Sequence, residues 1–164
     1  MKIGISNIER KAIFPPFLII ILLIGVWLTG KGYREGPMDF RAGRWGDSPQ
    51  DVIGRESSAG FTPAGDMKPD GDSVVLVFQD MTIMDYRCDV AYRFTSAANP
   101  LLVAGEYRFH RLTNSFKKQL TATLESKYGR PVETSENRQV YEVPRTTIIF
   151  DLKVGRLIHE KNVM

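Results

Sequence analysis

One stretch of the sequence limits the fold more than any other, the apolar run at residues 12–29. Its 18 residues carry no charge, and they lie between Arg10–Lys11 and Lys31. As an α-helix the run would be about 27 Å long, close to the hydrocarbon thickness of a bilayer. A helix at the surface of a soluble domain keeps one polar face, whereas this run is apolar all round. We therefore expect residues 12–30 to form a transmembrane helix, with the lipid bilayer as its partner.

The end of this run bears on whether it is cleaved. Signal peptidase prefers small residues at the −3 and −1 positions. Cutting after Gly30 would put Leu28 at −3, and cutting after Thr29 would put Trp27 there. The only cysteine is Cys88, so no lipid-attachment cysteine follows the run. We expect an uncleaved anchor, and a secreted domain released by signal cleavage is the alternative.

The orientation of the anchor follows from its short N-terminal side. Basic residues flank the run on both sides, so the positive-inside rule gives nearly a tie. A short basic N-terminus before a first apolar helix is typical of a signal-anchor, which leaves the C-terminal part outside the cytoplasm. The predicted organisation is a short N-terminal tail (1–11), the transmembrane anchor (12–30), a tether (31–39) and an extracytoplasmic domain (40–164).

The net charge of +3 lies mainly in the N-terminal tail that flanks the predicted anchor. Residues 1–30 hold three basic groups and one acidic group, which leaves 19 basic and 18 acidic groups in the remainder. Binding of nucleic acid requires basic residues interleaved with aromatic ones on one surface. The aromatic residues of the basic second helix, Phe116 and Tyr128, belong to its apolar stripe. The sequence therefore predicts no nucleic-acid partner.

Residues near the start of the domain predict the beginning of a helix. Ser48 is a natural N-cap, Pro49 suits the first helical position, and Asp51 completes a capping box. Gly54 and the small residues after it keep this helix short. Residues 59–73 are rich in glycine, proline and aspartate and are predicted to form a loop.

Beyond this loop the pattern predicts strands, a second helix and more strands. Alternation of apolar and polar residues indicates strands at 73–79, 87–94 and 101–109, and later at 139–143, 146–152 and 156–160. Between the two sets, apolar residues recur every four positions from Leu112 to Tyr128. Thr113 or Asn114 can cap this helix, and Gly129 ends it.

These elements predict an α+β domain, an antiparallel sheet with two helices on one face, in the order α-β-β-β-α-β-β-β. A duplicated α-β-β-β unit stays open as an explanation of this order. The register of the hairpin at 87–109 is also open. One choice pairs Tyr92 with Gly105 and Asp89 with Arg108, which would place an aromatic ring over bare backbone and form an ion pair.

Short motifs carry a resemblance to known proteins. Residues 40–48 read F-R-x-x-x-W-G-x-S in outline, Tyr92–Phe94 and Tyr107–Phe109 read Y-x-F, and Leu124–Pro131 read L-x-x-x-Y-G-x-P. This pattern resembles small, uncharacterised bacterial extracytoplasmic proteins over roughly residues 40–152. More distantly, the order of elements is similar to β-lactamase-inhibitor protein and to small outer-membrane-assembly lipoproteins. The resemblance implies a binding role in the bacterial envelope, and it brings no catalytic residue.

Several patterns that could signal chemistry are incomplete. Asp66, Asp70 and Asp72 lack the spacing and the closing glutamate of a calcium loop, and they are interpreted as a solvated loop. No nucleophile motif accompanies the two histidines, His110 and His159, and they are interpreted as ordinary surface or boundary residues. The single thiol, Cys88, is interpreted as a buried small side chain. Four acidic residues near the central strands are interpreted as structural surface residues: Asp80, Asp85, Asp89 and Glu106. We expect no metal and no cofactor.

The candidate partner-binding residues are Arg41, Arg44 and Trp45, because an aromatic ring beside two guanidinium groups can stack against a ligand or partner. The alternative for Trp45 is that it fixes the first helix to the sheet. The sequence thus predicts a single-pass protein of the bacterial inner membrane, whose periplasmic domain is a non-enzymatic binding module for an envelope protein. A pocket between the first helix and the sheet, serving a small ligand or a reaction, is the alternative.

Overall fold

The structure is a computed structural model that describes residues 39–162, which belong to one compact unit at residues 37–164. This part of the chain forms two helices and eight strands: α2 (Pro49–Ser58), β1 (Lys68–Asp70), β2 (Ser73–Ile83), β3 (Tyr86–Thr95), β4 (Leu102–Phe109), α3 (Asn114–Tyr128), β5 (Glu133–Ser135), β6 (Arg138–Val143), β7 (Thr146–Asp151) and β8 (Arg156–Lys161). The α+β class and the antiparallel sheet are confirmed. The predicted anchor, residues 12–30, lies outside the described residues. Within residues 39–162, no helix has both the length and the apolar character needed to cross a membrane.

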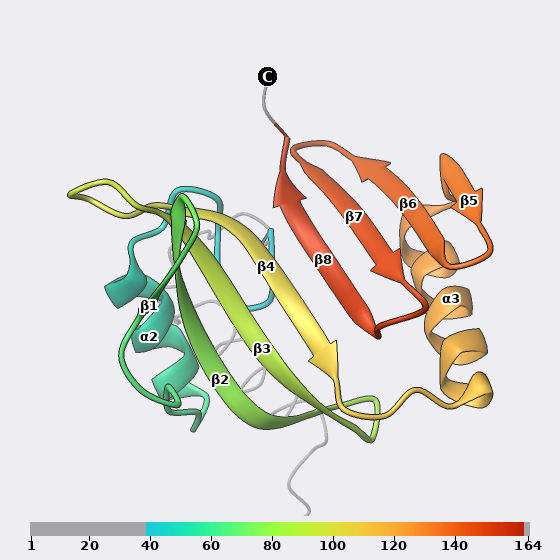
Figure 1. Cartoon of the computed structure of the whole chain (residues 1–164), viewed down its shortest axis with the longest axis horizontal. Coiled ribbons are helices and arrows are strands. Elements are labelled where there is room, and N and C mark those ends of the chain that lie inside the picture. Colours follow the sequence, from blue (N-terminus) through green and yellow to red (C-terminus); the bar gives the residue numbers. More distant parts are fainter. Residues whose placement is uncertain (1–38, 163–164) are drawn as a thin grey trace, which may run out of the picture. The chain divides into compact units, whose positions relative to one another are not determined.

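All eight strands form one antiparallel sheet in the order β1-β2-β3-β4-β8-β7-β6-β5 (Figure 1). A helix followed by a four-stranded meander therefore occurs twice, and the last strands of the two meanders, β4 and β8, pair at the centre. The repeat that was left open from the sequence is present in the topology, with four strands in each half instead of three. We call the part from α2 to β4 the α2 half and the part from α3 to β8 the α3 half.

The two strands that the sequence did not predict are β1 and β5, which form the edges of the sheet. Each has three residues, and all six are exposed. Short exposed edges carry no alternating apolar pattern, so periodicity gives no signal for them. β2 also runs four residues further than predicted, through a bulge between Phe78 and Met81 at which Asp80 has φ 53°.

Both helix starts form as the sequence indicates. The Ser48 hydroxyl accepts a hydrogen bond from the Asp51 N–H at 3.3 Å, and the Asp51 carboxylate accepts one from the Ser48 N–H at 3.0 Å. Of the two expected caps of the second helix, Thr113 is the one that forms: its hydroxyl accepts a hydrogen bond from the N–H of Phe116 at 3.1 Å. Gly129 ends α3 with φ 84°, a conformation that favours glycine.

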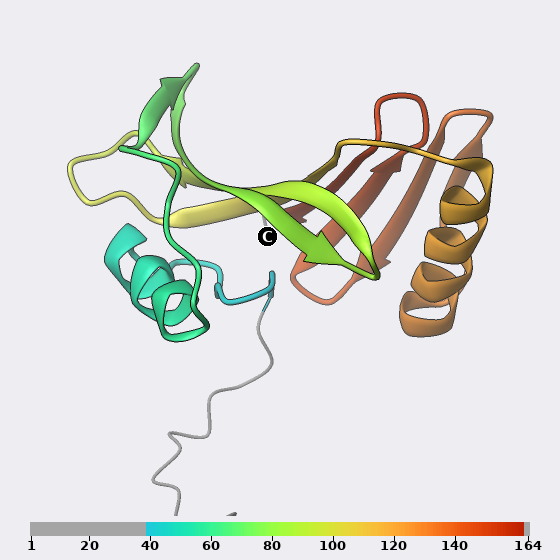
Figure 2. The ribbon, with the colours of Figure 1, turned by 90° about the horizontal axis from the view of Figure 1, so that it is seen from below.

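Strand register places both helices on the same face of the sheet. Tyr92 pairs with Gly105, Gly105 with His159, His159 with Ile148, and Ile148 with Tyr141. These five residues therefore form one row across the sheet and belong to the same face. Tyr92 contacts α2 through its hydroxyl, and Tyr141 lies beside the last residue of α3. Figure 2 shows both helices on one side of the curved sheet.

The register that pairs Asp89 with Arg108 is also confirmed. The two side chains form ion pairs with other residues instead of with each other. Asp89 lies 3.0 Å from the His110 ring, and Arg108 pairs with Glu106 at 2.9 Å. The ring that covers Gly105 belongs to Phe40, because a Cβ at Gly105 would lie 1.9 Å from Phe40 Cδ1. Glycine is therefore required at position 105 for the segment before α2 to lie against the sheet.

Candidate functional site

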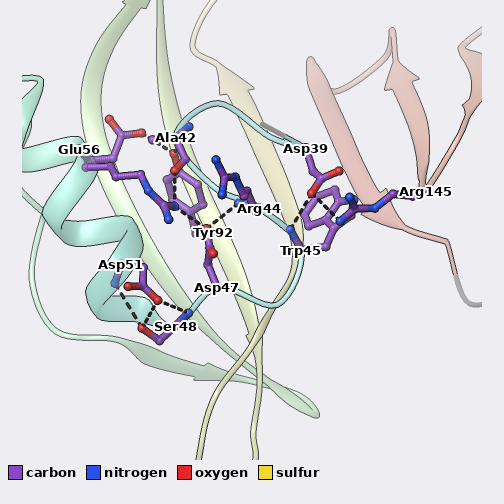
Figure 3. A network of polar contacts seen from close by, with 11 residues as sticks. Asp39, Ala42, Arg44, Trp45, Asp47, Ser48, Asp51, Glu56, Tyr92 and Arg145 are labelled. Atoms are coloured by element: carbon purple, nitrogen blue, oxygen red, sulfur yellow. Dashed lines mark hydrogen bonds and ion pairs between the residues drawn. The ribbon is translucent and has the colours of Figure 1, made fainter. Parts of the chain in front are cut away.

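The segment at residues 39–47 crosses the helix-bearing face of the sheet, contains a tight turn, and is held at its C-terminal end by the backbone of Leu102. Phe40 and Gly43 form a tight turn through an isolated bridge. The N–H of Gly46 donates to the Leu102 carbonyl, and the N–H of Leu102 donates to the Asp47 carbonyl, both at 2.9 Å. We call residues 39–47 the crossing segment; Figure 3 shows its polar contacts.

Arg41 contacts a carboxylate that is buried in the α2 half. Its Nε lies 2.6 Å from Oε1 of Glu56, whose side chain is 1% exposed, and its guanidinium lies 4.9 Å from the centre of the Phe61 ring. The Tyr92 hydroxyl also donates to Glu56. Burial and, next, this hydrogen bond raise the pKa of Tyr92, so the phenol stays protonated. The space between α2 and the sheet is therefore closed by a satisfied ionic cluster.

Trp45 joins the two halves of the domain. Its ring is 7% exposed, and Nε1 donates a hydrogen bond to Oγ1 of Thr146, at the start of β7, at 2.9 Å. Its backbone N–H donates to the Asp39 carboxylate at 2.9 Å, and Arg145 pairs with the same carboxylate at 3.1 Å. The ring thus connects the crossing segment to the α3 half. The sequence alternative had Trp45 fix the first helix to the sheet, whereas its hydrogen bond reaches β7.

Arg44 completes the trio of candidate partner-binding residues, and it lies on the same segment as Arg41 and Trp45. It is half-buried, and its backbone N–H donates to Asp47 at 2.7 Å. The structure therefore brings Arg41, Arg44 and Trp45 together, with contacts inside the domain for each. Their role toward a partner stays a prediction.

A cavity lies between the crossing segment and α3, on the same face of the sheet. Its volume is about 360 Å³, within the range usual for small-molecule sites. The apolar part of its wall comes from five different elements: Phe40, Ile83, Phe109, Leu120, Leu124 and Leu157. A neighbouring hollow of about 240 Å³ shares Asp39, Lys127, Tyr128 and His159 with it. The sequence placed a candidate pocket beside the first helix, whereas this cavity lies beside the second.

His159 lines both hollows and is the most unusual polar group in them. The residue is 6% exposed, and no partner for its Nδ1 is present in the part of the chain that the structure describes. Burial and, next, the charge of Lys127 lower the pKa of His159 to about 4. The ring is therefore neutral near pH 7, with a buried nitrogen that still has a hydrogen bond to make.

The charges around the cavity do not balance. Asp39 is paired with Arg145, and Arg41 is paired with Glu56. Lys127 is exposed and lies with Nζ 4.9 Å from the centre of the Tyr128 ring, and no carboxylate of residues 39–162 pairs with it. One positive charge at the mouth is thus uncompensated by the residues that the structure describes.

The other sequence candidates lie in structural settings. Asp70 pairs with Arg93 at 2.7 Å, and Glu106 is held by Arg108 and Arg156. Burial raises the pKa of the Cys88 thiol to about 11, which keeps it protonated. No group of three or more acidic, histidine or cysteine side chains that could hold a metal occurs between residues 39 and 162.

The interpretation of His159 as a surface or boundary residue is wrong, because it is 6% exposed. The alternation along β8 puts Leu157 and His159 on the same, inward side of the strand, and this pattern is a sequence signal for both residues. Phe40 and Lys127 carry no such signal, because their place depends on how the crossing segment and α3 approach the sheet. Comparison with protein-family models, curated proteins and solved structures finds no match for this chain.

Proposed function

We propose that the protein is a single-pass, membrane-anchored binding module whose domain lies outside the cytoplasm and holds its ligand in the cavity beside α3. The observation that carries this proposal is a cavity of about 360 Å³ with mainly apolar walls and an unpartnered, buried imidazole nitrogen. A cavity that stays empty would be expected to have only apolar groups in its wall. A buried polar atom costs free energy unless it forms a hydrogen bond. His159 lines the cavity wall, so a small shift of its ring would let a bound molecule supply that hydrogen bond.

Binding without chemical conversion fits the groups that line the cavity. A general base works best when its pKa lies near the operating pH, whereas that of His159 is about 4. The only cysteine, Cys88, is buried and protonated, and it is not part of the cavity wall. The carboxylate of Asp39 is occupied by Arg145 and by the Trp45 N–H. These settings favour a positioning role for each group.

The binding proposal is tested by native mass spectrometry of the full chain extracted in a mild detergent. We expect a non-covalent adduct on the parent that is lost from Thr123→Trp, because Thr123 is exposed at the cavity wall and an indole there would occupy the space. Ser126→Trp, on the exposed side of the same helix and absent from the cavity wall, is the control. If the parent carries no adduct, or if Thr123→Trp keeps it, the cavity is not the binding site.

The topology is tested separately with a reporter that is active only outside the cytoplasm, fused after Met164. We expect an active fusion in the membrane fraction, and an intact N-terminus in the mass spectrum of the mature chain. A silent fusion at normal expression would overturn the orientation. A mature chain that begins after Thr29 or Gly30 would replace the anchor with a cleaved signal.

A further inference from the structure

The cavity has a polar end and an apolar end, and their chemistry defines a class of ligand. This inference rests on the proposed function, since it concerns the same cavity. Asp39, Lys127, Tyr128 and His159 lie together in both hollows, with Asp39 paired to Arg145, whereas Phe109, Leu120 and Leu124 occur only in the larger one. A complementary molecule therefore has one polar head and one apolar body.

The sign of the head follows from the charges. Lys127 is the only charged side chain of the cavity wall without an ion-pair partner among residues 39–162, since Asp39 and Arg41 are both paired. One uncompensated cation favours one negative charge. The neutral His159 ring strengthens this choice, because a neutral imidazole carries one N–H that can donate to an oxygen of the head.

The size of the body follows from the volume. A cavity of about 360 Å³ holds the volume of roughly a dozen water molecules in the liquid, and a methylene chain of about ten carbons with a small head has a similar number of non-hydrogen atoms. We infer that the cavity binds a singly charged anionic amphiphile, with its carboxylate or phosphate at Lys127 and His159 and its hydrocarbon part among Phe109, Leu120 and Leu124. Such a molecule can come from solution, as a free fatty acid, or from the bilayer, as an anionic lipid.

The two histidines provide a local readout. With only His110 and His159 in the chain, labelling histidine with carbon-13 at Cε1 gives two signals, one from the cavity and one from an exposed site beside Asp89. The full chain is placed in nanodiscs of phosphatidylcholine and titrated with decanoate. We expect the His159 signal to move to saturation while the His110 signal stays in place.

Matched ligands and variants measure how much the charged head and the hydrocarbon body each contribute to binding. Decanol has the same chain without the charge, and decyltrimethylammonium reverses the charge; both should bind at least about tenfold more weakly than decanoate, the value of one charge-assisted hydrogen bond. Lys127→Met should weaken decanoate by about the same factor and leave decanol unchanged. Lys118→Met, on an exposed position of the same helix outside the cavity wall, should behave as the parent.

The remaining comparisons distinguish the sources and the two proposals. Movement of the His159 signal in discs that contain phosphatidylglycerol, without decanoate, identifies the bilayer as a source; movement only with decanoate identifies the free amphiphile. If decanol binds as tightly as decanoate and Lys127→Met has no effect, the anionic head is wrong although the cavity still binds. If no amphiphile moves the His159 signal, the amphiphile is wrong. If, in addition, native mass spectrometry finds no adduct on the parent, or an adduct that Thr123→Trp keeps, both proposals fail.

Discussion

The two halves of the domain share an element order but fill the space under their helices differently. In the α2 half, Glu56 points inward and is held by Arg41 and Tyr92, so that the layer between helix and sheet is closed. In the α3 half, the inward residues are Phe116, Leu120 and Leu124, and a cavity remains beside the last two. The topology alone therefore does not determine the site. A few inward side chains and the crossing segment decide which half stays open.

The largest expected effect contrasts one buried position from each helix. Val52 on α2 is 0% exposed, and Leu120 on α3 is 4% exposed but lines the cavity. An aspartate at position 52 buries an unpaired charge and should lower the free energy of unfolding by about 5 kcal/mol. Leu120→Asp should cost about 3 kcal/mol, because its carboxylate can reach water through the cavity. Urea unfolding of the full chain measures both, and equal losses would contradict an open α3 half.

The second prediction concerns the ionic cluster that closes the α2 half. Arg41→Met leaves Glu56 buried beside Tyr92 without its cation, and it should destabilise the domain by about 4 kcal/mol. Adding Glu56→Gln removes the orphaned charge and should recover more than half of that loss. The same urea assay applies. A double variant as unstable as Arg41→Met alone would show that packing, and not charge, closes this half.

Much of this contrast lies beyond what periodicity can show. Local signals were sufficient for the capping box at Ser48 and for the end of α3 at Gly129, because each depends on a few neighbouring residues. They left the pairing of Tyr92 with Gly105 as one choice of register, which the structure confirms. The inward direction of Glu56 was not visible, since an acidic residue in a short helix normally indicates a solvated face. Its burial depends on Arg41, fifteen residues earlier, and on Tyr92, thirty-six residues later.

The candidate site was predicted only in part for a similar reason. The sequence singled out Arg41, Arg44 and Trp45, and these do lie together on the crossing segment. The cavity residues Phe40, Lys127 and His159 come from three separate elements, which only the tertiary packing brings together.

The third prediction uses the neutral histidine of the α3 half. His159 has a pKa of about 4 in the folded domain and about 6.5 when unfolded. Between these values the unfolded chain binds the extra proton, so stability falls as the pH drops from 6.5 to 4, by about 3 kcal/mol in total. His159→Gln should lose most of this slope, whereas His110→Gln should keep it. Stability measured by urea at pH 7, 5.5 and 4.5 tests this, and an unchanged slope in His159→Gln would assign it to other groups.

The smallest effect tests how the halves are joined. Trp45→Phe keeps most of the buried ring but removes the hydrogen bond to Thr146, and it should cost about 1 kcal/mol. Thr146→Val removes the other partner. If this bond carries the effect, the double variant loses about as much as the larger single loss, because the second change has nothing left to break. Fully additive losses in the urea assay would instead mean that the two side chains stabilise the domain independently, and that this hydrogen bond does not couple the crossing segment to the α3 half.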